Sequence, residues 1–194
     1  MKISRMFLYD DYKGTRDYLK TQSRYELGRT ILYFVISISL FVAGIITTGD
    51  RMNVLTVVAV LGCLPACKSA IDAFMFLRYK GCTLENADTI DAHMEGLTGL
   101  YDRIFTSYNI NFQVAHMTVK GNTICGFTQD DKFDENAFNQ HITTLLQKDG
   151  FQEFSVKIFK YIKKYTVRLD QIKELDADEK NTKGIINTLN SVSL

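Results

Sequence analysis

The chain of 194 residues has no tryptophan, a single proline and only three histidines. The histidines show neither the H-x-x-x-H nor the H-E-x-x-H spacing of helical metal sites, and the sequence has no glycine-rich phosphate loop and no G-x-S-x-G motif. Folding could bring together His116, in an expected strand, and His141, in the next expected helix, but such a pair lacks a carboxylate, and separately hydrogen-bonded histidines are expected. No catalytic residue, cofactor or metal ligand is therefore assigned, and the sequence favours a protein that is not an enzyme.

Charge is absent from two neighbouring segments, residues 31–48 (ILYFVISISLFVAGIITT) and residues 54–67. The first covers about 27 Å as a helix, close to the bilayer core of about 30 Å. The second uncharged segment continues as an apolar pattern to Leu77. The residues GDRMN connect the two segments. The sequence predicts a transmembrane hairpin over residues 31–80, with spans at about 31–48 and 54–77 in the lipid bilayer. Two buried helices of a soluble protein are the alternative, but such helices keep a polar stripe. A cleaved signal peptide is rejected, because TGDRMN is not a small-residue cleavage site.

Lysine and arginine are distributed unevenly around these segments. The first 30 residues hold seven and the connecting loop holds only Arg51, while Lys68, Arg78 and Lys80 follow the second run. Because positive residues favour the cytoplasmic side, both termini are expected in the cytoplasm of a cell with its hairpin in the plasma (inner) membrane. Residues 1–30, with a net charge of +3, are expected as a juxtamembrane helix, either solvated or lying on anionic lipid.

The motif CLPAC lies inside the second apolar run. Its two cysteines are four residues apart, and two thiolates could hold a soft metal, but no third ligand lies nearby. Small residues let membrane helices approach closely, and a proline bends a helix. We therefore expect a packing face, which also permits a homo-oligomer through the spans, formed by Ala59, Gly62, Cys63, Pro65, Ala66 and Cys67.

Residues 81–194 are expected to form a cytoplasmic α/β domain with the order α-β-β-β-α-β, followed by one or two helices. A helix from Asn86 or Asp88 to about Glu95 precedes three strands in LYDRIFTSY, NFQVAHMTV and TICGFTQ. Asp134 is expected to cap the next helix and Gly150 to end it. A strand in EFSVKIFKYI and a helix in YTVRLDQIKEL follow, and the tail is expected to dock as a short helix or fray. Cys82 and Cys125 are expected as free thiols, because the cytoplasm is reducing.

This order resembles the core of the restriction endonuclease-like fold. Members of that family cut nucleic acid with an acid on the second strand and an acid-x-Lys motif on the third, which together bind Mg²⁺. Neither NFQVAHMTV nor TICGFTQ contains Asp or Glu, and only Asp102 and Glu95 stand as remnants. The resemblance therefore supports the fold and argues against a nuclease.

The segments YKGTRDYLKTQSRYELGRT and NVLTVVAVLGCLPACKSAIDAFMFLR also resemble a family of small two-span membrane proteins from Firmicutes. Some of its members carry the label "O-linked GlcNAc transferase-like". The resemblance implies a bacterial membrane protein and brings no functional residues. The chain shows no helical repeat and no sugar-nucleotide site that would support the label.

A basic run, VKIFKYIKKYTVR, contains five cations and no acid: Lys157, Lys160, Lys163, Lys164 and Arg168. Three interpretations remain open: a solvated face, a surface for anionic lipid, or a nucleic-acid site in which Tyr161 and Tyr165 stack bases. Nucleic acid is the least favoured, because residues 81–150 carry a net charge of −6. The sequence as a whole predicts a membrane-anchored adaptor or sensor domain for an unknown ligand or cytoplasmic partner. The alternative is an enzyme, a diverged nucleic-acid-processing domain.

Overall fold

The computed structural model describes residues 12–107, 110–175 and 178–194. The chain divides into two compact units. One contains residues 19–80, and the other contains residues 12–18 together with residues 81–194.

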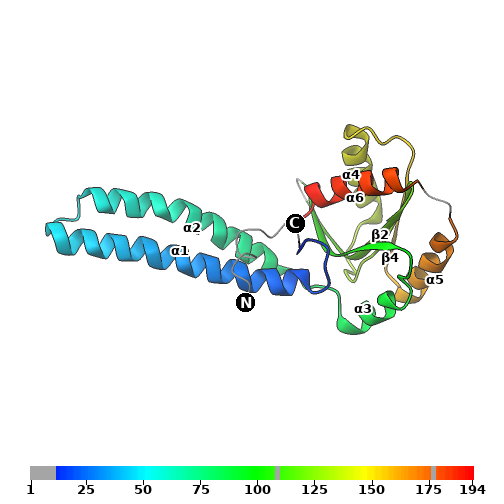
Figure 1. Ribbon diagram of the computed structural model, residues 1–194, viewed down its shortest axis with the longest axis horizontal. Coiled ribbons are helices and arrows are strands. Elements are labelled where there is room, and N and C mark those ends of the chain that lie inside the picture. Colours follow the sequence, from blue (N-terminus) through cyan, green and yellow to red (C-terminus); the bar gives the residue numbers. More distant parts are fainter. Residues whose placement is uncertain (1–11, 108–109, 176–177) are drawn as a thin grey trace. The chain divides into compact units, whose positions relative to one another are not determined.

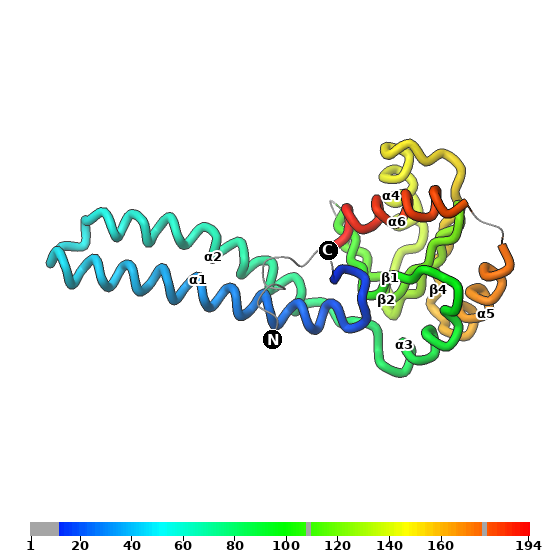
Figure 2. Tube along the Cα trace, viewed as in Figure 1, coloured from blue at the N-terminus to red at the C-terminus, as the bar shows by residue number. Residues whose placement is uncertain are grey.

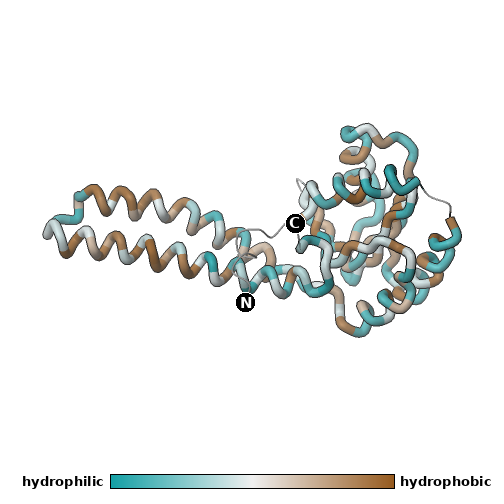
Figure 3. Tube along the Cα trace, in the orientation of Figure 1, coloured by the Kyte–Doolittle hydropathy of each residue, from teal (hydrophilic) through white to brown (hydrophobic). Residues whose placement is uncertain are grey.

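The first unit is a hairpin of two helices, α1 (Tyr18–Thr48) and α2 (Val54–Arg78), which lie side by side in Figure 1. The Asn53 side chain begins α2 by accepting a hydrogen bond from the Thr56 N–H at 2.9 Å. Both helices are long and apolar enough to cross a membrane. Figure 3 shows the resulting hydrophobic colour along most of both helices.

Small side chains are buried between the two helices. Gly44 and Ser37 are buried on α1, and the buried residues of α2 follow a three- and four-residue spacing: Ala59, Ala66, Ser69, Ala73 and Phe76. This spacing keeps one stripe of each helix toward its partner. Apart from Phe76, many of the large apolar side chains instead point outward: Ile46 is 78% exposed, Val54 80% and Leu64 67%.

A polar cluster joins the helices at the end away from the connecting loop. Thr30 donates a hydrogen bond to the Ser69 Oγ at 3.0 Å, and the Arg29 Nε–H donates to the same oxygen at 3.2 Å. Arg29 also forms an ion pair with Glu26 and lies 3.6 Å from the Asp72 carboxylate. Arg29 on α1 thus forms an ion pair with Asp72, whereas Lys68, four residues from Asp72 on α2, is the partner expected from the sequence spacing.

The second unit is built on a four-stranded sheet in the order β1-β2-β3-β4. The strands β1 (Thr98–Thr106), β2 (Asn111–Lys120) and β3 (Thr123–Phe127) are antiparallel neighbours, and β4 (Ser155–Phe159) is parallel to β3. The helix α3 (Leu84–Asp91) precedes β1, and α4 (Glu135–Lys148) connects β3 to β4. The helices α5 (Ile162–Lys173) and α6 (Glu179–Val192) follow β4, so the observed order is the predicted α-β-β-β-α-β with two further helices.

Helices cover both faces of the sheet, as Figures 1 and 2 show. On one face, Phe138 and Ile142 of α4 and Leu189 of α6 pack with Met117 and Ile124 of the sheet. On the other face, residues of α3 and α5 pack with the sheet in a second cluster that includes Ile90, Tyr101, Cys125, Tyr165 and Leu169. Each face thus buries its own apolar core.

Helix boundaries follow the local signals with some shifts. The Asp134 carboxylate accepts hydrogen bonds from the N–H groups of Asn136 and Ala137, both at 3.0 Å, so α4 begins where the cap predicted. By contrast, α3 ends at Asp91 and does not reach Glu95. The tail forms α6, a helix of 14 residues.

The alternation of side chains between the two faces of the sheet is broken in β1 at Asp102, which has a left-handed φ of 55°. Tyr101 packs in the cluster under α3 and α5, but Phe105 packs in the cluster under α4 and α6. These two positions would share a face in a regular strand, since side chains alternate with period two. The shift coincides with Asp102, and Arg103 donates hydrogen bonds to Ser193 and Asn190 at the C-terminal end of the chain.

Candidate functional site

The outer strand β4 and helix α5 form the two walls of a groove of about 610 Å³. Alternate residues of β4 share one face of the strand, and residues three or four apart share one face of the helix. We call this site the basic groove. It is lined by Ser155, Lys157 and Phe159 of β4 and by Lys163, Lys164, Val167, Arg168 and Gln171 of α5.

Three of the four cations of the basic groove contact neutral side chains. The Lys157 amine lies 5.4 Å from the centre of the Phe159 ring, and the Lys164 amine lies 5.5 Å from that of Tyr161. Arg168 donates a hydrogen bond to the Gln171 side-chain oxygen at 3.1 Å. Aromatic faces and amides orient a cation without neutralising it. The groove therefore keeps its positive charge available to an anion.

Arg168 lines the groove but also has a buried part. Its Nε atom is buried and has no hydrogen-bond partner among the described residues. A buried donor without a partner is unfavourable. Burial raises the pKa of the Cys125 thiol, and a side-chain hydrogen bond with Arg168, followed by the charges of Arg168 and Lys157, offsets part of that increase. Positive charge thus also acts on the sheet side of the groove.

Four of the five cations in the predicted basic run line this groove. The exception is Lys160, whose amine donates a hydrogen bond to the Asp131 carbonyl at 3.2 Å. The strand ends at Phe159 and α5 begins at Ile162, so Lys160 lies in the turn between them. Sequence reasoning missed four lining residues, which are Ser155, Phe159, Val167 and Gln171. For Gln171, the i+3 spacing from Arg168 on a helix was the available signal.

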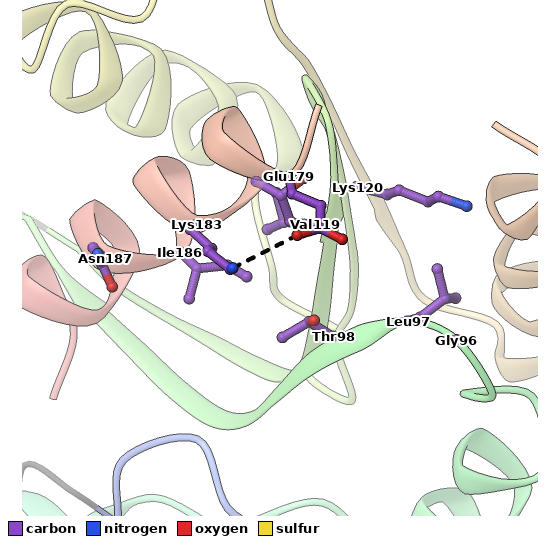
Figure 4. Close-up of a pocket in the computed structure, with 10 residues that line it drawn as sticks. Gly96, Leu97, Thr98, Val119, Lys120, Glu179, Lys183, Ile186 and Asn187 are labelled. Carbon is purple, nitrogen blue, oxygen red and sulfur yellow. Dashed lines mark ion pairs between the residues drawn. The ribbon is translucent and has the colours of Figure 1, made fainter. Parts of the chain in front are cut away.

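A second cavity, of about 570 Å³, lies between α6 and the adjoining ends of β1 and β2. Figure 4 shows Lys183 and Glu179 of α6 pointing toward each other, with 3.6 Å between their charged groups. The Lys120 amine points away and donates a hydrogen bond to the Lys173 carbonyl at 2.6 Å. Because both lysines already have oxygen partners, this cavity offers an anion less than the basic groove does.

The structure does not bring the histidines together. His116 contacts Tyr165 on the α5 face, with 2.6 Å between its Nδ1 and the phenol oxygen, and burial lowers its pKa to about 3. His141 lies beside the Phe112 ring, which belongs to the core on the α4 face. His93 contacts the Asp170 carboxylate at 2.8 Å.

The residues expected to pack around CLPAC divide between buried and outward positions. Ala59 and Ala66 are buried between the helices, and Gly62 and Cys63 are half-buried. Pro65 and Cys67 are exposed on the hairpin. All four cysteines of the chain are free.

The two acids singled out as nuclease remnants take different positions. The Asp102 carboxylate is buried and accepts a hydrogen bond from the Cys82 N–H at 2.7 Å. Glu95 is exposed in the turn after α3. Within the described ranges, no three side chains of His, Cys, Asp or Glu gather in a way that would hold a metal ion.

Comparisons with known proteins add no relative: no family model matches the chain, and neither a curated protein nor a solved structure matches it.

Proposed function

We propose that this protein is a membrane-anchored adaptor whose α/β unit binds an anionic partner in the basic groove. The observation that carries the proposal is that four cations line one groove beside neutral side chains. No acid contributes to its lining, and none of the four forms an ion pair with a described residue. Because solvated cations on a protein surface commonly have carboxylate neighbours, this arrangement favours binding over simple solvation.

The anchor in this proposal is the α1–α2 hairpin, with residues 31–48 and 54–77 as the spans. Its outward apolar side chains would contact lipid tails, and the seam of small residues would hold the helices together. The excess of lysine and arginine outside the connecting loop supports a cytoplasmic location for both termini. The polar cluster around Arg29 and Ser69 then lies near the cytoplasmic end of the hairpin, where polar groups reach water.

Cysteine labelling in intact cells tests the anchor and its orientation. Met52 is 89% exposed in the connecting loop, and Glu153 is exposed next to β4. We expect Met52→Cys to react with a membrane-impermeant maleimide, and Glu153→Cys to react only after the membrane is permeabilised. Reaction of Glu153→Cys in intact cells would show that the orientation is the opposite of the proposed one. Release of the protein from membranes by an alkaline wash would contradict the proposal that the hairpin spans the membrane.

Binding of anionic probes tests the groove. The full chain in nanodiscs of neutral phosphatidylcholine is titrated with fluorescent polyglutamate and, separately, with vesicles containing phosphatidylglycerol. We expect binding of an anionic probe that weakens with salt and falls about tenfold or more when Lys163 and Lys164 are both replaced by Glu. The matched control replaces two exposed lysines outside the groove, Lys148 and Lys180, and should bind as the wild type does. Equal losses in both variants would contradict the proposal.

A second candidate is a diverged nucleic-acid-processing domain, and the element order α3-β1-β2-β3-α4-β4 is the observation that favours it. The same titration with a single-stranded oligonucleotide, with and without Mg²⁺, tests this candidate. Tight binding at physiological salt together with Mg²⁺-dependent cleavage would replace the adaptor proposal.

A further inference from the structure

The strand β4 is the last strand of the sheet, and one of its edges is open. The Ser155 N–H donates to the Asn122 carbonyl at 2.8 Å, and the Phe159 carbonyl accepts from the Thr128 N–H at 3.0 Å. Residues that bond a neighbouring strand alternate, so the N–H and C=O groups of Val156 and Ile158 point to the opposite edge. In the described part of the chain, no strand pairs with this edge.

The other end of the sheet is covered by the chain itself. The Tyr101 N–H of β1 donates to the Gly14 carbonyl at 2.9 Å, and the Leu194 N–H donates to the Ile104 carbonyl at 3.0 Å. Proteins generally cover or block the edges of their sheets, because open edges pair with other chains. The contrast between the two ends makes the β4 edge the place where an additional strand would fit.

The basic groove runs beside this open edge. One wall is the face of β4 that carries Ser155, Lys157 and Phe159, and the other wall is α5. A groove between an edge strand and a helix is the arrangement in which an extended peptide adds to a sheet, with alternate side chains entering the groove. In this groove the side chains that enter would meet Lys157, Lys163, Lys164 and Arg168.

We propose that an extended acidic peptide of a partner protein binds along β4 as a fifth strand, with its carboxylates in the basic groove. This inference rests on the proposed function and names its partner class. The peptide main chain would bond the outward N–H and C=O groups of Val156 and Ile158. A carboxylate at every second position would face the groove cations and accept charge-assisted hydrogen bonds from them.

Charge and edge together favour a peptide over the other anions. A phosphate group has acceptors but no main-chain donors, so it leaves the outward carbonyls of β4 unpaired. A stacked nucleobase would have to displace Lys164 from Tyr161 and Lys157 from Phe159. A peptide supplies donors, acceptors and carboxylates in one repeating geometry that matches the five residues of β4.

The test uses the full chain in phosphatidylcholine nanodiscs and a fluorescent, end-blocked peptide of alternating Glu and Val. Two further versions carry N-methyl groups, one on every Glu nitrogen and the other on every Val nitrogen. In an extended peptide, one of these two sets of N–H groups faces β4 and the other faces away. We expect one methylated peptide to bind at least about tenfold more weakly than the other, a difference of about 1.4 kcal/mol.

The protein variants locate the peptide. Replacing Lys163 and Lys164 by Glu should weaken binding about tenfold or more, while the Lys148→Glu, Lys180→Glu control should leave it unchanged. Vesicles of phosphatidylglycerol and an oligo-dT strand are titrated in parallel.

Each outcome decides between the two proposals. Equal binding of the two methylated peptides would overturn strand addition and leave an electrostatic groove. Groove-dependent binding of vesicles or oligo-dT, without peptide binding, would overturn the peptide as ligand and keep the groove as a site. Failure of every probe, in all variants, would overturn the proposed function itself.

Discussion

Ser37 on α1 lies opposite Gly62 on α2 so closely that a Cβ atom on Gly62 would come within 2.8 Å of the Ser37 Oγ. A contact this short requires the neighbouring atom to move. The absence of a side chain at Gly62 therefore favours the close approach of the two helices at this level. The motif next to it, CLPAC, contributes Ala66 to the same buried stripe.

Replacing Gly62 by Leu should separate the helices and lower the free energy of unfolding of the hairpin by about 1–3 kcal/mol, as overpacking does. Unfolding by sodium dodecyl sulfate in mixed micelles, followed by far-ultraviolet circular dichroism, measures this loss. The matched control is Cys67→Leu, which adds a larger side chain to an exposed position of the same helix. Comparable losses in both variants would show that the seam does not depend on Gly62.

The buried His116 makes stability depend on pH. Its pKa is lowered by burial to about 3 in the folded protein, compared with 6.5 for the unperturbed side chain. Between these values the unfolded chain binds the proton and the folded chain does not, so stability is full above pH 6.5 and falls as the pH drops toward 3. The slope from this residue reaches about 1.4 kcal/mol per pH unit.

We expect His116→Gln to remove that slope. Urea unfolding at several values between pH 7 and pH 4.5 measures it, and the difference between wild type and variant isolates His116 from the carboxylates. His141→Gln is the control, since His141 is less buried and its pKa is lowered less. An unchanged slope in His116→Gln would show that His116 titrates normally.

Two cysteines of the α/β unit should be inert in the folded protein. Cys125 is buried, and burial raises its pKa; burial and then the Asp102 carboxylate raise the pKa of Cys82 to about 12. Since the thiolate is the reactive form, both should react with maleimide only after unfolding. Mass spectrometry of the labelled full chain, before and after urea, measures this. Rapid labelling of Cys125 in native protein would contradict its burial. A lack of labelling at Cys82 and Cys125 therefore reflects their environment in the folded unit and carries no information on membrane orientation.

The sequence predicted the elements that carry their own local signals. The cap at Asp134 and the positive-φ Gly150 bracket α4, and the uncharged runs correspond to α1 and α2. The helix α6 carries only weak local signals, because its apolar positions, such as Ile185 and Leu189, stand among Asn, Thr and Gly residues with poor helix propensity. Packing on the sheet stabilises it, and packing is not a local signal.

The candidate site was predicted in part for the same reason. The run of cations is visible in the sequence, but the start of α5 decides which of them share a groove. With α5 beginning at Ile162, Lys163 and Lys164 stand on its first turn and face the groove with Arg168. The open edge of β4 exists because β4 is the last strand in the order of the sheet. The sequence does not show beside which strand β4 lies, because β4 is joined to β3 through a helix and not through a hairpin turn.

Gly14 and Arg103 provide a stability test of the other sheet edge. Gly14 has a φ of 81°, and a Cβ atom there would lie 2.6 Å from the Arg103 Nη2. Arg103 is fully buried, and burial lowers its pKa to about 10. Gly14→Ala should therefore combine backbone strain of about 1–2 kcal/mol with displacement of a buried cation from Ser193 and Asn190.

Gly96→Ala is the matched control, because Gly96 has a φ of 74° but open space around its Cβ position. It should show only the strain, so Gly14→Ala should be more destabilising by at least about 1 kcal/mol in urea unfolding followed by circular dichroism. The double variant Gly14→Ala, Arg103→Met separates the two causes. Methionine removes the clashing guanidinium but leaves the backbone strain, so the double variant should be more stable than the sum of the single changes predicts. Strict additivity would mean that Gly14 is required for its backbone conformation alone, and that Arg103 does not depend on the missing side chain.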